Sequence, residues 1–245
     1  MKPFLLYING FPAAGKTSIA KHVLQHTENT ILLDSKAFNS LIAARCVEGA
    51  RKQDFDDIGG FCDKLGLEGA ERTELSERLT ELASEALDLQ TFDSGKSHFP
   101  TPQHYELVGR IRDTALSFIF RSEQMADKNF IFTNTLYNEN RHHKILLQKM
   151  IDFSKMGKRD FQGVTLVAEQ SAMLNRANNA DRKAQHKTTD SEALQKLFDK
   201  HTLIDLGSQI DSTNIDAAQA ELMEKISQRK NEEFGSVEKE IITES

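Results

Sequence analysis

The stretch "FLLYINGFPAAGKTS", from Phe4 to Ser18, decides how the rest of the chain is interpreted. It opens with a near-continuous apolar run, which is typical of a strand buried on both faces of a parallel sheet. After "GKTS" the apolar residues recur at helical spacing as far as Gln25. We therefore predict a strand over Phe4–Asn9, then a glycine-containing loop, and then a helix over Thr17–Gln25.

The loop between these two elements has the spacing G-x-x-x-x-G-K-S/T, which is typical of a phosphate-binding loop. Glycines at such positions permit positive φ angles, so that successive backbone N–H groups can face one anion. The helix adds its own N-terminal N–H groups and the positive end of its dipole. Lys16 would supply a mobile charge to the outer phosphates, and Thr17 would supply a hydroxyl ligand to Mg²⁺. The predicted nucleotide contacts are Gly10, Ala13, Ala14, Gly15, Lys16, Thr17 and Ser18.

Four further apolar segments predict the other strands of a sheet. They are Asn29–Asp34, Lys128–Thr135, Gly163–Gln170 and His201–Gly207. Helical patterns separate most of them, as over Gln103–Ala126 and Glu139–Gly157. Strands that alternate with helices predict an α/β fold, here a three-layer sandwich with a five-stranded, mostly parallel sheet.

About ninety residues separate the second predicted strand from the third, which is far more than one crossover needs. The segment from about 47 to 98 is rich in Glu, Asp, Leu and Ala, and we interpret it as a helical insertion. Its apolar residues repeat at helical spacing, at Leu75, Leu79, Leu82, Ala86 and Leu89. A loop follows, and Thr101 is a suitable N-cap for the next helix, with Pro102 at its first position.

The composition of the chain excludes several classes of protein. The chain has 245 residues, of which 38% are hydrophobic and 28% charged, and a formal net charge of −6. This balance predicts a globular protein and argues against a dedicated nucleic-acid binder, which usually shows a basic face. No apolar run approaches the roughly 20 residues of a membrane span. Cys46 and Cys62 have no zinc or CxxC spacing, so we expect free thiols and a cytoplasmic protein.

Two further features of the sequence, together with the phosphate-binding loop, resemble those of a known group of proteins. One is Asp34 at the end of the second strand, and the other is "LNRANNADRKAQ", from Leu174 to Gln185. With them the chain resembles the small P-loop kinases, such as chloramphenicol phosphotransferase, zeta toxin, gluconate and adenylylsulfate kinases, and the kinase part of polynucleotide kinases. The resemblance covers most of the chain but excludes the insertion.

The resemblance implies a P-loop NTPase fold and an ATP- and Mg²⁺-dependent phosphotransferase. Such an enzyme would move the γ-phosphoryl group to a hydroxyl of a small molecule. It also implies a kinase domain over 1–230, with a lid at about 174–188, and a polar C-terminal tail at 231–245.

Chemistry supports roles for three of these side chains. A carboxylate at Asp34 can accept the proton of an attacking hydroxyl or hold a water on Mg²⁺, although Asp34 could instead cap the following helix. The guanidinium groups of Arg176 and Arg182 can neutralise charge on the transferred phosphoryl group. The alternative is that both arginines are ordinary surface residues of a helix.

The third strand departs from the pattern of many P-loop NTPases. It ends in Thr133, Asn134 and Thr135, and no carboxylate appears before Glu139. This argues against a motor or switch ATPase, and it leaves open a site that binds nucleotide but turns over slowly. Asn134 and Thr135 could touch the acceptor, and Arg141 could reach phosphate or remain a surface residue. The pair His142-His143 is interpreted as surface residues of a helix.

The sequence gives the least information about the molecule that accepts the phosphoryl group. Lys36 and Arg45 could hold an anionic acceptor or be surface charges. A long nucleic acid needs several phosphate contacts, and the sequence shows no basic stripe to provide them. The first alternative to a small-molecule kinase is a nucleotide-binding regulatory or interaction module with weak or no turnover. The second is a polynucleotide 5′-hydroxyl kinase.

Overall fold

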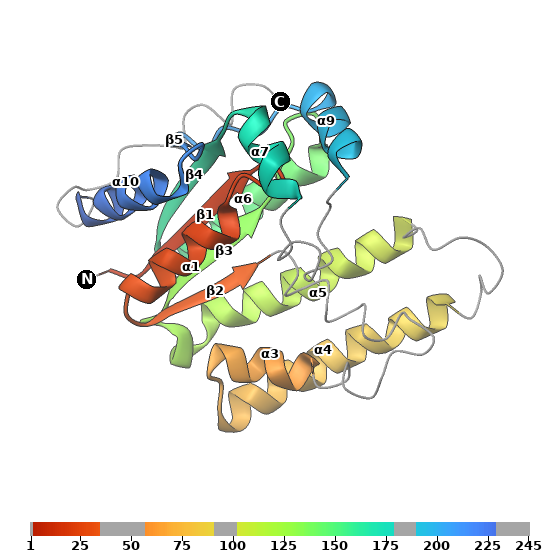
Figure 1. Ribbon diagram of the computed structural model, residues 1–245. Coiled ribbons are helices and arrows are strands. Elements are labelled where there is room, and N and C mark those ends of the chain that lie inside the picture. The colour runs from red at the N-terminus through yellow and green to blue at the C-terminus, as the bar shows by residue number, and fades with distance from the viewer. Residues whose placement is uncertain (1, 35–56, 91–101, 179–189, 229–245) are drawn as a thin grey trace. The chain divides into compact units, whose positions relative to one another are not determined.

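The computed structural model describes residues 2–34, 57–90, 102–178 and 190–228 (Figure 1). The chain divides into two compact units. One combines Met1–Leu32 with Asn129–Ser245, and the other is Leu33–Lys128. Predictions that concern Lys36, Arg45, Cys46, Arg182 and the 231–245 tail lie outside the described residues.

A five-stranded sheet organises the fold, and its strand order is β2-β3-β1-β4-β5. The strands are β1 (Phe4–Gly10), β2 (Thr30–Asp34), β3 (Asn129–Asn134), β4 (Asp160–Val167) and β5 (Gln209–Asp211). β1 pairs in parallel with both β3 and β4, and β4 pairs in parallel with β5. All seven residues of β1 are buried, as the apolar run predicts for a central strand. The predicted α/β fold with a five-stranded, mostly parallel sheet is thereby confirmed.

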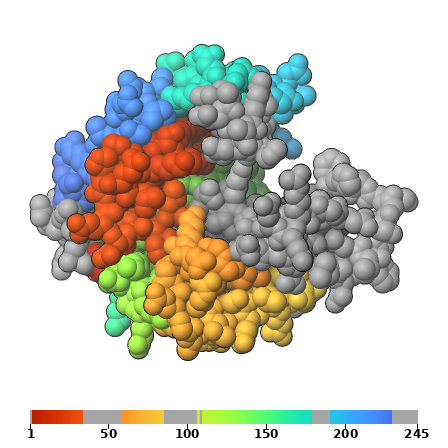
Figure 2. Space-filling model, turned by 60° about the horizontal axis from the view of Figure 1, so that its bottom comes forward, coloured from red at the N-terminus to blue at the C-terminus, as the bar shows by residue number. Residues whose placement is uncertain are grey.

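Helices cover both faces of this sheet within the first unit. They are α1 (Lys16–His26), α6 (Arg141–Met156), α7 (Gln170–Ala177), α9 (Ser191–Lys200) and α10 (Ile215–Gln228). α1 packs on β1 and β3 and against α10, which itself contacts β5, while α6 contacts β4. In the space-filling view, the red atoms of the N-terminal segment lie directly against the blue atoms near the C-terminal end of the described chain (Figure 2).

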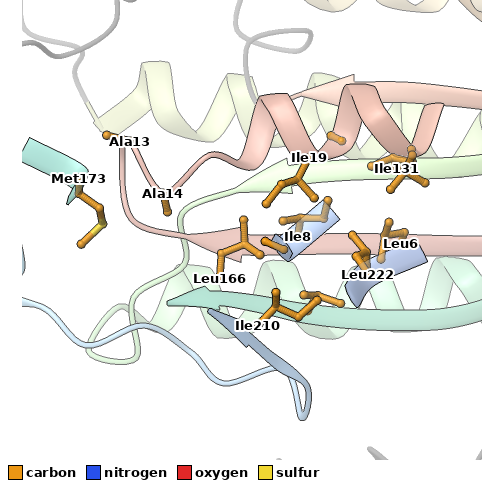
Figure 3. Packing of buried hydrophobic residues seen from close by; sticks show 14 of the residues in the cluster. Leu6, Ile8, Ala13, Ala14, Ile19, Ile131, Leu166, Met173, Ile210 and Leu222 are labelled. Atoms are coloured by element: carbon orange, nitrogen blue, oxygen red, sulfur yellow. The ribbon is translucent and has the colours of Figure 1, made fainter. Parts of the chain in front are cut away.

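The core of the first unit follows the alternation of side chains along β1. Leu6 and Ile8 face one side of the sheet, where they join Ile19 of α1 and Leu222 of α10 in one buried cluster (Figure 3). Tyr7 faces the other side. Its ring stacks on two aromatic rings from the neighbouring strands, those of Phe132 and Phe161.

The fifth strand lies later in the chain than predicted. The apolar segment His201–Gly207 is not the strand; β5 is Gln209–Asp211, where only Ile210 is buried. The earlier segment instead pairs with the loop after β3. Ile204 N–H donates to Leu136 O at 3.0 Å, and Asn138 N–H donates to Thr202 O at 2.8 Å. The predicted fourth strand is also displaced, because β4 ends at Val167 and α7 already begins at Gln170.

The second unit is helical where it is described. Its elements are α3 (Asp57–Leu65), α4 (Gly69–Gln90), α5 (Pro102–Arg121) and a short 3₁₀ turn (Glu123–Met125). Leu75 and Leu79 of the predicted repeat are fully buried. Glu71 of α4 accepts hydrogen bonds from the Ser122 hydroxyl and from Glu123 N–H, which ties α4 to the end of α5. The helix predicted to reach Ala126 ends at Arg121, because Ser122 has an extended backbone conformation and a 3₁₀ turn follows it.

Cys62 provides a test of packing in this unit. Its side chain is fully buried, and burial raises the pKa of the thiol, an effect larger than the opposing influence of Arg72. Because only the thiolate reacts readily, we expect a Cys46→Ser variant to react with a thiol reagent at least about 100-fold more slowly when folded than in urea. A stopped-flow assay with an aromatic disulfide measures this ratio, and equal rates in the two conditions would contradict the packing described.

Among the described residues, no helix has both the length and the apolar character that crossing a membrane requires.

Candidate functional site

The loop that links β1 to α1 is held close to β4 at its first glycine. A Cβ on Gly10 would lie 3.2 Å from Leu166 Cβ and 3.3 Å from both Ala14 Cβ and Leu166 O. Such approaches are tighter than ordinary van der Waals contacts, so a glycine suits this position. Ala14 N–H then donates to Phe11 O at 3.1 Å, which closes a tight turn after the strand.

Two loop residues have left-handed backbone conformations. Ala13 has a φ of 68° and Gly15 a φ of 91°. Gly15 is also the N-cap of α1, and the first intrahelical bond runs from Ile19 N–H to Gly15 O at 3.0 Å. The earlier N–H groups of the helix therefore have no acceptor within it. A loop of this conformation before a helix N-terminus has the geometry that binds anions in proteins.

Gly15 supplies a prediction about stability. A Cβ at this position would overlap Cδ1 of Ile215, the first residue of α10. An alanine here would also have to adopt the left-handed φ of Gly15. We expect Gly15→Ala to lower the free energy of unfolding by about 1–3 kcal/mol, mostly from backbone strain, because Cδ1 is the mobile end of the Ile215 side chain and can move aside at a smaller cost. Urea denaturation measures the change.

Two variants separate the causes in that experiment. In a background of Ile215→Ala, the overlap is gone and only the backbone strain of about 1–2 kcal/mol should remain. Gly60→Ala is the matched control, because nothing lies within 4 Å of a Cβ built at this position in α3. It should stabilise the protein slightly, by roughly 0.5–1 kcal/mol. A Gly15→Ala variant as stable as the wild type would show that the loop does not have this conformation.

Lys16 turns its ammonium group back over the loop. Nζ donates to Gly10 O at 2.7 Å, to Phe11 O at 2.9 Å and to Thr135 Oγ1 at 3.1 Å. These three acceptors match the three protons of an ammonium group. Thr17 lies in the first turn of α1, and its predicted role as a ligand of Mg²⁺ stays a prediction.

The polar end of β3 contacts the protein itself. Asn134 Nδ2 donates to the Tyr7 hydroxyl at 3.3 Å, and Asn134 Oδ1 accepts from Thr135 N–H at 2.8 Å. Thr135 Oγ1 donates to Gly10 O at 2.9 Å. The expectation that Asn134 and Thr135 could touch the acceptor stays a prediction beside these contacts. Their side chains bind the strand and the loop.

Glu139 also serves the local structure. Its carboxylate accepts from Thr202 N–H at 2.8 Å, and Oε2 lies 3.6 Å from Nδ1 of His201. Hydrogen bonds from its own backbone and from that of Thr202 lower the pKa of this carboxyl. Glu139 thus joins the loop after β3 to the segment before β5.

Arg176 lies near the end of α7 and anchors a second loop. Nη2 donates to Ser212 O at 2.7 Å and to Thr213 O at 2.5 Å, both between β5 and α10. Nη1 is buried and has no hydrogen-bond partner among the described residues. Burial lowers the pKa of this guanidinium, while Asp211 opposes that effect. Arg176 therefore has a structural role through Nη2, and its predicted role at the transferred phosphoryl group stays a prediction. Arg182 and the predicted lid beyond residue 178 lie outside the described residues.

The start of α6 places the other basic candidates. Arg141 is exposed at the first position of the helix, and the Asn140 side chain caps it by accepting from His142 N–H at 2.9 Å. His142 is exposed, as predicted, but His143 is not a plain surface residue. Its Nδ1 accepts from Tyr137 N–H at 2.8 Å, so it shapes the loop after β3.

Two supporting groups were not recognised as such in the sequence. Asn9 is fully buried, and its side chain accepts from Leu136 N–H at 2.7 Å and donates to Ile204 O at 2.8 Å. The ring of Phe11 packs 6.0 Å from Tyr137 and 5.1 Å from Phe198. An amide at the end of an apolar strand was the available signal for Asn9. No local signal marks the partners of Phe11.

Comparison with known proteins gives structural likeness only. No protein-family model and no curated protein matches the sequence. The structure is similar to a gluconokinase from Sinorhizobium meliloti 1021, with 10% identity and a TM-score of 0.42, over 93% of this chain and 97% of that one. It is also similar to a tunicamycin resistance protein from Deinococcus radiodurans, with 12% identity and a TM-score of 0.42, over 96% and 99%. Both TM-scores are low, so the fold assignment rests on the strand order and pairing of this chain.

Proposed function

We propose that the protein is an ATP-dependent phosphotransferase that moves the γ-phosphoryl group of ATP to a hydroxyl of a small molecule. The observation that supports this most directly is the loop of residues 10–17. Its left-handed residues, the start of α1 and the ammonium of Lys16 are brought together at the carboxyl end of the central strand. Ligands of open parallel sheets bind at that end of the strands.

The proposed roles follow from the chemistry of the transfer. Backbone N–H groups of the loop and Lys16 would hold the phosphates, and Thr17 would hold Mg²⁺, which would supply charge neutralisation at the outer phosphates. Asp34 ends β2, an edge strand of the same sheet, and accepts the proton of the acceptor hydroxyl. The oxygen of that hydroxyl attacks the γ-phosphorus, and the bond from this phosphorus to the bridging oxygen breaks, so that ADP leaves. Arg176 and Arg182 balance charge on the transferred group.

The first test is binding and turnover. Calorimetric titration with ATP and Mg²⁺ should give a dissociation constant in the micromolar range or below, a value ordinary for kinase substrates. Transfer is then measured with γ-labelled ATP against a panel of sugars, nucleosides, aminoglycosides and other hydroxyl compounds. A labelled product other than inorganic phosphate supports the proposal. A protein that binds no ATP at millimolar concentration would exclude it.

A second candidate is a nucleotide-binding regulatory module with weak or no turnover. It is favoured by one observation, the end of β3, where Thr133 is buried and no carboxylate is available from that strand for the metal. Tight ATP binding without any labelled product across the panel would select this candidate. The same titration and the same panel therefore distinguish the two functions.

A further inference from the structure

The hydroxyl of Thr135 lies where the central loop meets the next strand. It accepts from Lys16 Nζ at 3.1 Å and donates to Gly10 O at 2.9 Å. A hydroxyl has one proton to donate and lone pairs to accept, so both bonds can exist at once. Thr135 thus contacts the charged group of the loop and the backbone at the start of the loop.

Thr135 is itself held firmly in place. Its N–H donates to Asn134 Oδ1 at 2.8 Å, and the next N–H, that of Leu136, donates to Oδ1 of the buried Asn9 at 2.7 Å. Asn9 directly precedes Gly10 on β1 and pairs in register with Asn134 on β3. The hydroxyl is therefore fixed relative to both strands, and it can fix Lys16 in turn.

We propose that Thr135 is a positioning residue for Lys16. In this inference, which rests on the proposed function, the hydroxyl keeps the ammonium over the loop of residues 10–17 and restrains the Gly10 carbonyl. From that place the ammonium exchanges its bond to Gly10 O or Phe11 O for one to the outer phosphates while it keeps its bond to Thr135. A lysine side chain loses much rotamer freedom when it is ordered, and a fixed acceptor reduces the part of that cost that falls on ligand binding. The residue acts through Lys16 and the loop and makes no contact with the reacting atoms.

A positioning role and a purely structural role of Thr135 predict different changes in the affinities for ATP, ADP and AMP. Lys16 of such a loop reaches the β- and γ-phosphates, not the first phosphate. Loss of the Thr135 hydroxyl should therefore weaken binding of ATP and ADP and leave binding of AMP nearly unchanged. A general loss of stability would not depend on the number of phosphates.

The test compares Thr135→Val, Thr135→Ser and the wild type by calorimetric titration with ATP, ADP and AMP. Valine has the shape of threonine without the hydroxyl, and we expect it to raise the dissociation constants of ATP and ADP about tenfold, in line with one lost bond to a charged group. Serine keeps the hydroxyl and should return both constants to within about threefold of the wild type.

Thr165→Val is the matched control. The Thr165 hydroxyl is buried in β4, where it donates to Ile204 O at 3.2 Å and accepts from Leu206 N–H at 3.0 Å, with no contact to Lys16 among the described residues. This variant should lower the urea midpoint as Thr135→Val does, yet bind ATP as the wild type does.

The outcomes separate the inference from the proposed function. If the wild type binds ATP, Lys16→Met does not, and Thr135→Val binds ATP normally, the positioning role is overturned while the proposed function stands. A loss in Thr135→Val that serine fails to restore, or that is equal for AMP, also overturns it. If the wild type binds no ATP, the proposed function fails and the inference fails with it.

Discussion

Lys16→Met is expected to reduce the rate of phosphoryl transfer by about 10²–10³-fold, the usual cost of removing one donor that stabilises charge in a transition state. The ammonium lies over the loop with its three bonds to Gly10 O, Phe11 O and Thr135 Oγ1. Methionine keeps most of the length of the side chain but offers no charge and no donor. The rate is measured with labelled ATP and whichever acceptor the panel identifies.

Lys21→Met is the matched control for that experiment. Lys21 is an exposed lysine of the same helix, α1, and the proposed site does not include it. Its substitution should leave the rate within about twofold, because exposed substitutions away from a site have small effects. Equal losses in both variants would point to a change in net charge or in folding. A Lys16→Met variant with the activity of the wild type would show that the loop has no part in the transfer.

The sequence predicted the β1–loop–α1 unit because its signals are local. The apolar run, the two glycines and the helical spacing lie within about twenty consecutive residues. The structure begins α1 at Lys16, one residue before the predicted start, and confirms the strand that precedes the loop. The role of these residues as nucleotide ligands stays a prediction.

The contacts that position Lys16 could not be predicted in the same way. Thr135 is 119 residues from Lys16 and 125 residues from Gly10. A single sequence shows that a polar residue ends the strand, but it does not show which loop the hydroxyl meets. That contact requires the register of β1 against β3, which pairs Asn9 with Asn134. The sequence therefore offers the acceptor as one possible contact of Asn134 and Thr135, and it does not indicate the bond from Thr135 to the loop.

The misplaced fifth strand has a similar cause. "HTLIDLG" is the more apolar segment, and it is indeed buried at Ile204 and Leu206. Its backbone groups, however, bond to Leu136 and Asn138 in the loop after β3. β5 has only three residues, which is too short for a hydrophobic period to identify.

Asp34→Asn is expected to reduce the rate of transfer by about 10²–10⁴-fold, the range that a general base usually contributes. Asparagine has nearly the same shape as aspartate but cannot accept the proton of the acceptor hydroxyl. Binding of ATP should change little, because the proposed contacts to its phosphates come from residues 10–18. The experiment compares steady-state rates with ATP affinity, so that an effect on chemistry is separated from an effect on binding.

The same substitution decides between the two interpretations of Asp34. If the carboxylate only capped a helix, asparagine would replace it well, because asparagine and aspartate are about equally good N-caps. Both the rate and the stability would then stay near the wild type. If Asp34 is the base, stability is kept and the rate falls, and the acidic limb of the pH–rate profile that belongs to this carboxylate disappears. Asp34→Ala completes the comparison, because alanine can neither accept the proton nor cap a helix, and loss of a cap would cost about 1 kcal/mol in unfolding free energy. An active Asp34→Asn variant with an unchanged pH profile would leave this carboxylate without a part in the reaction.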